Sequence, residues 1–253
     1  MSLKPFHFKE FTVAQDRCAM KIGTDGVLLG AWTSVEEFPD SILDIGTGTG
    51  VIALMLAQRS DAMTIDAVEL DDNAYEQAID NFEHSIWGDR LFCYHAHLYE
   101  FAAEIDDEYD LIVCNPPFYM EALNDESKEL QRLRSAKDGA AIEAREQARL
   151  EESMPFELLV GAVAKLLSED GAFNVIIPYE REDDFILLCS RAGLFPSRIT
   201  RVKGSPTSAI KRSLMEFRFR ESVSKNTELT IEHKRHEYTE DYIHLVKDFY
   251  LKM

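Results

Sequence analysis

Long apolar stretches are missing from this sequence. No run approaches the roughly 18 apolar residues that a membrane-spanning helix needs, and the opening MSLKPFHFKEF has no apolar segment followed by a small-residue cleavage site. Glycine and proline are few, with 12 and 8 among 253 residues, which excludes a collagen-like or linker-dominated chain. We therefore expect a soluble, cytoplasmic protein with one substantial hydrophobic core.

Cysteine is also scarce. The four cysteines, Cys18, Cys93, Cys114 and Cys189, are widely spaced and form no CxxC pair. Structural zinc sites are usually built from closely spaced cysteine and histidine pairs. The sequence therefore predicts four reduced, partly buried thiols and no bound metal.

Positive charge is in short supply, because 27 Lys and Arg face 46 Asp and Glu, a net charge of −19. The averaged field repels phosphate, which argues against sequence-blind binding to a polyanion. Locally the balance reverses, since residues 198–220 contain a single acid, Glu216. The basic residues of this stretch are Arg198, Arg201, Lys203, Lys211, Arg212, Arg218 and Arg220.

Short apolar runs alternate with amphipathic stretches between residues 41 and 180, which is typical of parallel strands joined by helices. Two further strand-like runs flank the turn-rich GSPTS and predict an antiparallel hairpin near the C-terminus. The fold class is thus α/β, a mostly parallel sheet with helices on both faces. The predicted strands are 41–46, 63–70, 90–96, 109–115, 172–178, 195–204 and 213–222, and the predicted helices are 51–58, 72–82, 156–171 and 182–193.

A glycine-rich motif, Asp44-Ile-Gly-Thr-Gly-Thr-Gly50, joins the first predicted strand to a helix, where glycines let backbone amides approach a ligand. Its spacing is GxGxG, and the acid before the first glycine repels phosphate. A cofactor with a cationic amino-acid end, such as S-adenosylmethionine, suits that acid. Glu69 stands 19 residues after Gly50, where it can accept hydrogen bonds from both ribose hydroxyls. The alternative is a structural turn beside an incidental acid.

A second motif, Asn115-Pro-Pro-Phe118, follows the fourth predicted strand, at the edge that also carries the glycine loop if the strands are parallel. An amino group conjugated to a ring is a poor nucleophile because its lone pair is delocalised. The Asn115 side-chain oxygen and the Pro116 carbonyl can each accept one N–H and aim that lone pair at a sulfonium methyl. Phe118 offers a ring on which a flipped-out base can stack. Alone, the motif could be a structural turn.

Together, the glycine loop, Glu69 and NPPF resemble the class I, S-adenosylmethionine-dependent amino-group methyltransferases. Residues 11–32, FTVAQDRCAMKIGTDGVLLGAW, are closely similar to the opening of the bacterial tRNA1(Val) adenine-37 N6-methyltransferases. The resemblance covers most of the chain and is weakest after about residue 226. It implies a seven-stranded, Rossmann-like sheet with a C-terminal hairpin, and N6-methylation of adenine 37 in the anticodon loop of tRNA1(Val).

The resemblance also implies a set of site residues, in which the segment before the first strand closes over the cofactor. Many relatives hold the cofactor's adenine with an acid where this chain has His97; a neutral His97 could accept that hydrogen bond, or be a plain surface histidine. The implied catalytic residues are Asn115, Pro116 and Phe118, and the implied cofactor-binding residues are Lys21, Gly23, Thr24, Asp25, Asp44, Gly46, Thr47, Gly48, Gly50, Glu69, Leu70, His97 and Asn115.

Contacts to tRNA phosphates are expected from the basic stretch at 198–220 and from the charged insertion at 119–150. The alternative for the basic stretch is a solvated strand face. We interpret residues 1–40 as an extension that packs on the core, 41–225 as the methyltransferase domain and 226–253 as a tail that completes it. The expected protein is a monomer.

Other functions remain open at this point. Glutamine N5-methyltransferases of release factors carry a long helical domain before the glycine loop, whereas only 43 residues precede Asp44 here. Guanine N2-methyltransferases of ribosomal RNA typically have a second, related domain. A small-molecule amine methyltransferase would not need the basic stretch, and an RNA-binding scaffold without turnover would not need an intact NPPF.

Overall fold

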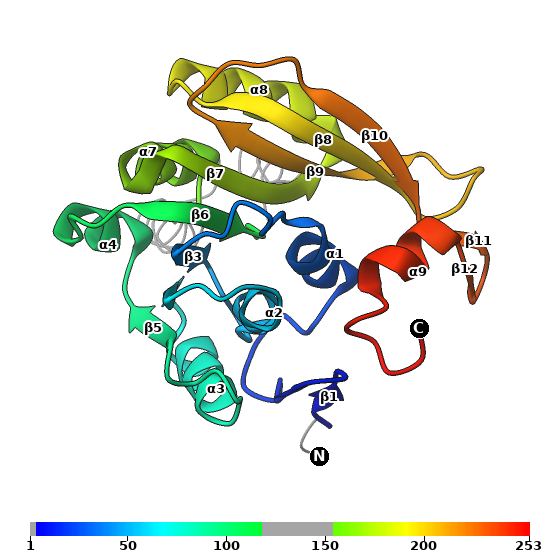
Figure 1. Ribbon diagram of the computed structural model, residues 1–253, viewed down its shortest axis with the longest axis horizontal. Helices are drawn as coiled ribbons and strands as arrows, with labels where there is room; N and C mark the ends of the chain where they lie inside the picture. The colour runs from blue at the N-terminus through cyan, green and yellow to red at the C-terminus, as the bar shows by residue number, and fades with distance from the viewer. Residues whose placement is uncertain (1–3, 118–153) are drawn as a thin grey trace, which may run out of the picture.

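The computed structural model describes residues 4–117 and 154–253. Within these ranges the largest sheet has eight strands in the order β10-β8-β9-β7-β6-β3-β4-β5 (Figure 1). Neighbouring strands far apart in the sequence are joined by crossovers, as an α/β fold requires. In chain order the strands of this sheet are β3 (Ser41–Ile45), β4 (Thr64–Glu69), β5 (Leu91–His95), β6 (Tyr109–Cys114), β7 (Leu167–Pro178), β8 (Phe195–Lys203), β9 (Ile210–Arg218) and β10 (Lys225–Thr230).

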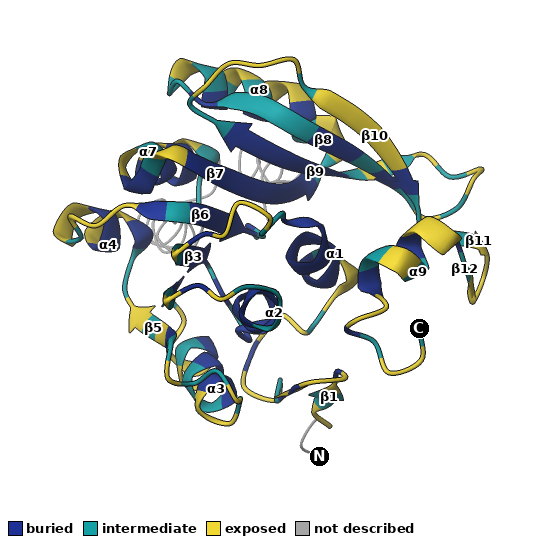
Figure 2. Cartoon of the chain, viewed as in Figure 1, coloured by how far each residue is buried: buried dark blue, intermediate teal, exposed yellow. Residues whose placement is uncertain are grey.

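Strand directions agree with the predicted architecture. Strands β5, β4, β3, β6 and β7 are mutually parallel, and β9 is antiparallel to both of its neighbours, β7 and β8. The prediction of seven strands was wrong, because β10 adds an eighth strand parallel to β8. Its sequence, KNTELT, is mostly polar, and the strand is mostly exposed (Figure 2). It therefore lacks the apolar alternation that predicts a strand, and its pairing with β8 positions it.

Helices cover both faces of the sheet. One buried cluster joins one face to α1, α2, α3 and α9, and a second cluster joins the other face to α4, α7 and α8 (Figure 1). The helices are α1 (Thr24–Trp32), α2 (Val51–Arg59), α3 (Asp72–Glu83), α4 (Leu98–Glu104), α7 (Phe156–Leu166), α8 (Glu182–Arg191), α9 (Glu240–Val246) and the 3₁₀ turn η1 (Tyr179–Arg181).

The helix predicted to reach Gly171 ends at Leu166, and β7 begins at once with Leu167. Leu167 pairs with Tyr109 and Ala172 pairs with Leu111, so β7 bulges by several residues between the two pairings. A Cβ at Gly171 would lie 2.8 Å from the Leu167 side chain. The glycine read as a helix stop therefore serves the bulge instead.

The two ends of the chain meet on the α1 side of the sheet. The hairpin of β1 (Phe6–His7) and β2 (Thr12–Val13) leads into α1, and the short hairpin of β11 (Glu232–Lys234) and β12 (Glu237–Tyr238) leads into α9. The Lys9 amide donates to the Phe249 carbonyl at 2.9 Å, joining the terminal segments. Both ends pack into the cluster that contains α1 and α2.

Candidate functional site

The glycine-rich loop connects the carboxyl end of β3 to α2. Gly46, Gly48 and Gly50 have φ values of 69°, 58° and 78°, a region that only glycine adopts without strain. A Cβ on Gly50 would also lie 2.5 Å from the Phe82 ring, whereas at Gly48 it would meet nothing within 4 Å. The loop is thus packed from behind at Gly50 and open to a ligand at Gly48.

Asp44 lies fully buried below this loop. Its Oδ2 accepts a hydrogen bond from the Thr47 hydroxyl at 2.6 Å, and its Oδ1 has no partner among the described residues. Burial raises the pKa of Asp44 to about 7, although the Thr47 hydrogen bond opposes that shift. An unsatisfied buried carboxylate oxygen is costly, so this position favours a ligand that brings a positive N–H group.

Glu69, the last residue of β4, contacts the same loop. Its Oε2 accepts a hydrogen bond from the Gly48 amide at 2.8 Å, and its Oε1 accepts from the Leu70 amide at 2.8 Å and the Asp71 amide at 2.9 Å. The Asp71 side chain in turn caps α3. Glu69 therefore positions the loop through hydrogen bonds within the chain, without a bound ribose.

His97 lies at the same edge as Glu69. The pairing of Glu69 with His95 aligns the ends of β4 and β5, and His97 follows two residues later as the half-buried N-cap residue of α4. Its ring centroid is 5.2 Å from that of Tyr99. This position is compatible with both readings of His97, the adenine contact and the surface histidine.

Asn115 and Pro116 follow β6 directly. The pairing of Ile45 with Cys114 aligns the ends of β3 and β6, so Asn115 and the glycine loop leave the sheet at the same edge. The Asn115 Oδ1 atom is buried and has no hydrogen-bond partner within the described chain. Phe118 and the 119–150 insertion lie outside the described residues.

Met154 was not anticipated as a neighbour of this edge. Its Sδ lies 3.9 Å from the Cys114 Sγ, and its methyl group lies 3.4 Å from the position of a Cβ on Gly46. The side chain thus contacts both the glycine loop and the end of β6. A single methionine after a long charged stretch carries no sequence signal that predicts such a contact.

The N-terminal segment reaches the site through α1. Gly23 is the N-cap residue of α1, Lys21 is exposed, and Asp25 accepts a hydrogen bond from Arg212 on β9 at 2.8 Å. Thr24 and Asp25 form the first turn of the helix. The ion pair places this turn beside the carboxyl end of β7, because Arg212 pairs with Pro178.

Asn81 on α3 is a further residue that the sequence did not single out. Its Oδ1 accepts from the Ala14 amide at 2.8 Å, and its Nδ2 donates to the Ala14 carbonyl at 2.9 Å and the Thr49 carbonyl at 2.8 Å. One turn earlier, Gln77 Oε1 accepts from the Arg17 amide at 3.1 Å. Asn81 therefore connects the N-terminal segment to the glycine-rich loop.

The residues at this edge fit the cofactor that the sequence predicted. The Asp44 Oδ1 atom is a buried acceptor without a partner in the described part of the chain, and Gly48 leaves space above the loop. S-adenosylmethionine presents N–H donors on a cationic amino-acid end, which match such acceptors. Asp44, Gly48 and Glu69 would hold the cofactor, and Asn115 would lie at the end of the neighbouring strand.

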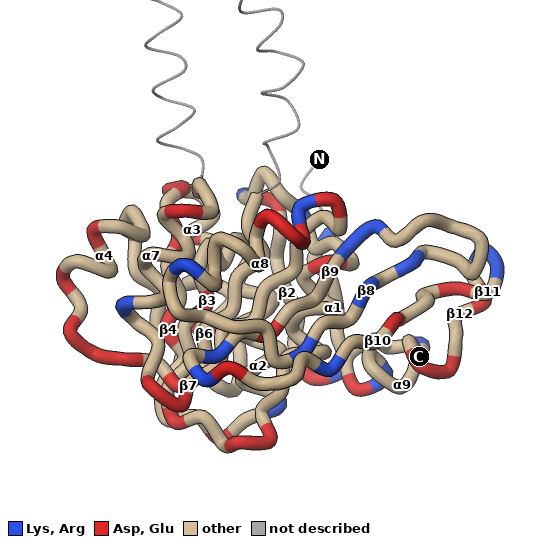
Figure 3. The backbone as a smooth tube through the Cα atoms, turned by 90° about the horizontal axis from the view of Figure 1, so that it is seen from above, with Lys and Arg blue, Asp and Glu red and all other residues tan. Residues whose placement is uncertain are grey.

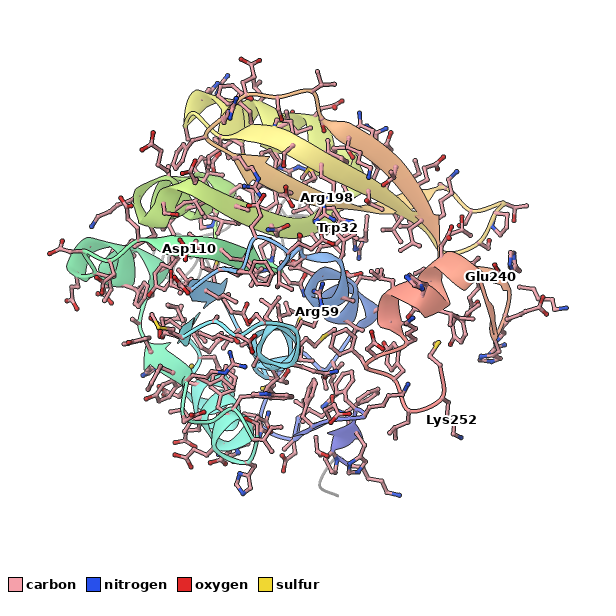
Figure 4. All side chains as sticks on the ribbon, viewed as in Figure 1. Trp32, Arg59, Asp110, Arg198, Glu240 and Lys252 are labelled. Carbon is pink, nitrogen blue, oxygen red and sulfur yellow. The ribbon has the colours of Figure 1, made fainter. Side chains whose placement is uncertain are left out.

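Five of the seven residues of the basic stretch form ion pairs, with Glu216 and with four acids from elsewhere in the chain. Figure 3 marks the positions of the basic and acidic residues along the backbone. Lys211 and Arg220 are exposed and make no ion pair with a described residue. Arg198 also lies over the Trp32 ring, 3.7 Å from its centroid (Figure 4). Among the described residues the six ion pairs are Arg198–Glu216, Arg201–Glu182, Lys203–Glu228, Arg212–Asp25, Arg218–Glu37 and Arg218–Glu216.

Strand direction further divides the basic stretch between two edges of the sheet. Pro178 pairs with Arg212 and Phe173 pairs with Phe217, so β9 begins at the edge where Asn115 lies and ends at the opposite edge. Lys211 therefore belongs to the edge of the candidate site, and Arg220 to the far edge. The seven residues do not form one continuous basic face.

Other kinds of site find no support in the described residues. Residues 4–117 and 154–253 contain no cluster of three or more potential metal ligands. No helix in these ranges is long and apolar enough to cross a membrane. Cys18, Cys114 and Cys189 are buried free thiols and Cys93 is partly buried; burial raises the pKa of Cys18 to about 12.

Comparison with known proteins gives one consistent result. The family model described as "Methyltransferase small domain" matches residues 24–140. Proteins named tRNA1(Val) (adenine(37)-N6)-methyltransferase are similar over the whole length: that of Christiangramia forsetii is 56% identical, with both chains covered completely, and that of Trichodesmium erythraeum is 44% identical over 98% of each chain. A crystal structure described as a predicted O-methyltransferase from Agrobacterium tumefaciens has the same fold, with a TM-score of 0.64, 17% identity and coverage of 89% of this chain and 96% of that chain.

Proposed function

Since the chain belongs to the family of tRNA1(Val) (adenine(37)-N6)-methyltransferases, we propose that it methylates N6 of an adenine in tRNA, at position 37 of tRNA1(Val). The methyl donor is S-adenosylmethionine. The observation that carries the proposal is the common edge of β3, β4 and β6, where the glycine loop, Glu69 and Asn115 lie together. This arrangement brings a donor site and an amine-binding motif to adjacent strand ends.

Asn115 and Pro116 are the proposed catalytic residues. The unpartnered Oδ1 of Asn115 and the carbonyl of Pro116 would each accept one N–H of the exocyclic amine. Holding both N–H groups in this way draws the nitrogen toward tetrahedral geometry and directs its lone pair. When bound, S-adenosylmethionine supplies an electrophilic methyl group to that lone pair. Phe118 is proposed to stack on the flipped-out adenine.

The cofactor is proposed to lie over the glycine loop. Asp44 would receive the cationic amino group, while Gly46, Gly48 and Gly50 allow the backbone to approach it. Glu69 and Leu70 would contact the ribose, and His97 the adenine ring. Thr47 keeps the Asp44 carboxylate oriented through its hydroxyl. Lys21, Gly23, Thr24 and Asp25 are proposed to close the pocket from the N-terminal side.

For the tRNA, we propose phosphate contacts from the insertion at 119–150 and from the end of the basic stretch nearest the site. Lys211 is the best candidate among the seven basic residues, because it is exposed at the site edge and unpaired with any described acid. Arg198 and Arg218 are instead held in ion pairs toward the far edge. A monomer acting in the cytoplasm is the proposed working form.

The test is incubation of the purified protein with labelled S-adenosylmethionine and total tRNA that lacks the modification. Nucleoside analysis of the digested tRNA should give labelled N6-methyladenosine. Labelled glutamine in a protein fraction, or labelled N2-methylguanosine in ribosomal RNA, would overturn the proposal in favour of the corresponding relative. Absence of label from every RNA and protein pool would favour a scaffold.

A further inference from the structure

Tyr179 stands at the end of the strand next to the NPPF motif. The parallel pairing of β6 with β7 joins Cys114 to Val175, so β7 continues to Pro178 beside the exit of Asn115. Tyr179 is the next residue and begins the 3₁₀ turn η1. Its side chain is an exposed aromatic, with 39% of its surface accessible. The chain thus presents a ring to solvent at the edge where the target adenine is proposed to enter.

A positive charge is fixed beside this ring. The Arg201 guanidinium carbon lies 5.7 Å from the Tyr179 ring centroid. Two nitrogens of Arg201 contact the buried Glu182 carboxylate, at 3.0 Å from Nε and 2.6 Å from Nη2. The Ser213 hydroxyl also donates to Glu182. Because Glu182 anchors it, the Arg201 guanidinium stays near the ring, and the Glu182 carboxylate balances its charge.

A lysine without an ion-pair partner in the described ranges lies on the same edge. Arg212 pairs with Pro178, so Lys211 is positioned beyond the end of β7, on the same side of the sheet edge as Tyr179. Lys211 is exposed and has no ion-pair partner in the described ranges. Tyr179 and Lys211 therefore combine an accessible ring with one unpaired positive charge at the same edge of the sheet, while Arg201 lies against the ring.

Proteins that bind single-stranded nucleic acids use this combination of groups. Unpaired bases stack on exposed aromatic rings, and neighbouring cations neutralise the phosphates between them. An anticodon loop contains such unpaired bases on both sides of its position 37. A ring that served only the core would be buried, as are Phe185 and Phe217 on the same side of the sheet.

We propose that Tyr179, supported by Arg201 and Lys211, is a stacking platform for an unpaired nucleotide adjacent to the target adenine. The proposal rests on the proposed tRNA methyltransferase function and assigns a separate subsite to it. Tyr179 would hold the substrate without contacting the reacting atoms. Its loss should therefore weaken tRNA binding and leave both the chemical step and cofactor binding intact.

The experiment measures steady-state methylation of an unmodified anticodon stem-loop by the full-length protein. Tyr179→Ala should raise KM for the stem-loop about tenfold, leave kcat within about twofold and leave the affinity for S-adenosylhomocysteine unchanged. Tyr179→Phe should keep the wild-type KM, because stacking requires the ring and not the hydroxyl. Tyr94→Ala is the matched control: Tyr94 is also 39% exposed, but it lies on β5, the edge strand that β6, β3 and β4 separate from β7.

A second arm identifies the stacked nucleotide. Stem-loops with an abasic ribose on the 5′ or the 3′ side of the target adenine are compared with the intact stem-loop. One of them should raise KM for the wild type and cause no further rise in Tyr179→Ala, because the two changes remove the same contact. An unchanged KM in a folded Tyr179→Ala protein, or an equal rise in Tyr94→Ala, would overturn the stacking platform while leaving the methyltransferase function standing. A wild-type protein that methylates no tRNA would overturn both.

Discussion

The Nδ2 atom of Asn81 donates a hydrogen bond of 2.8 Å to the carbonyl oxygen of Thr49 inside the glycine-rich loop. The same amide group makes two hydrogen bonds with Ala14. One buried side chain on α3 thus fixes both the loop after β3 and the N-terminal segment that leads to α1. The two halves of the proposed cofactor pocket share a single support.

Asn81→Asp should lower the affinity for S-adenosylhomocysteine at least about tenfold, because the carboxylate loses both donated hydrogen bonds. The matched control is Gln77→Glu, an equivalent change one helical turn earlier. The Gln77 Nε2 atom has no partner in the described structure, and its accepting oxygen is retained in Glu. Calorimetry measures the affinities and thermal unfolding checks the fold. Equal loss of affinity in two folded variants would contradict a specific role for Asn81.

Cofactor binding should depend on pH through Asp44. Its pKa of about 7 means that the folded protein carries a proton on this carboxyl below that pH, whereas a cationic amino group favours the ionised form. Affinity for S-adenosylhomocysteine should therefore fall about tenfold between about pH 8 and about pH 6. Asp44→Asn should bind more weakly and show a flat profile over this range. A wild-type affinity that is constant from about pH 6 to about pH 8 would contradict the assignment.

Two glycines of one loop should respond differently to alanine. Gly50→Ala adds a clash with the Phe82 ring to the strain of a positive φ, so the free energy of unfolding should fall by about 2 to 4 kcal/mol. Gly48→Ala should lower the free energy of unfolding by only about 1 to 2 kcal/mol, but its methyl group projects into the open space proposed for the cofactor.

Urea unfolding and calorimetry separate the two glycine effects. For Gly48→Ala, the loss of binding free energy for the cofactor should exceed the loss of the free energy of unfolding. Gly50→Ala should be the less stable of the two proteins. A Gly48→Ala variant that is more strongly destabilised than Gly50→Ala and still binds S-adenosylhomocysteine normally would contradict a loop that is packed at Gly50 and open to the cofactor at Gly48.

Charge reversal at the two edges tests the tRNA path. Lys211→Glu should raise KM for tRNA severalfold, because it places a negative charge next to the phosphate backbone at the site edge. This rise in KM should become larger as the salt concentration falls. Arg220→Glu is its control, since Arg220 is also exposed but follows β9 at the far edge. Methylation rates at several salt concentrations measure the effect. An equal change in both variants would indicate only a response to net charge.

Local sequence requirements made much of the fold and site predictable. The loop glycines stand where the backbone angles strongly favour glycine, and the NPP segment ends an apolar run, so the position of both motifs could be predicted from neighbouring residues alone. The parallel strands were found from apolar runs, and the C-terminal hairpin from its turn residues. Their common edge then followed from strand direction.

Long-range pairing was beyond reach of the same reasoning. Arg212 is matched to Asp25 across 187 positions, and Asn81 to Ala14 across 67, and neither partner is marked by spacing or composition. The sequence therefore left two interpretations of the basic stretch, phosphate contacts or a solvated strand face, and gave no sign of the four acids from elsewhere in the chain that pair with it. Strand β10 was not predicted for a related reason: backbone hydrogen bonds to β8 position it, and its sequence has no apolar pattern.

The most direct measurement compares two asparagine variants on a tRNA1(Val) transcript, with N6-methyladenosine at position 37 as the readout. Asn115→Ala should reduce methyl transfer by at least about a hundredfold while S-adenosylhomocysteine binds nearly as before, because the variant loses the acceptor that orients the amine. Asn174→Ala, which truncates a buried asparagine on β7 whose side-chain amide is also unpartnered in the described chain, should stay active. Full activity in Asn115→Ala, or methylation at a nucleotide other than adenine 37, would contradict the account.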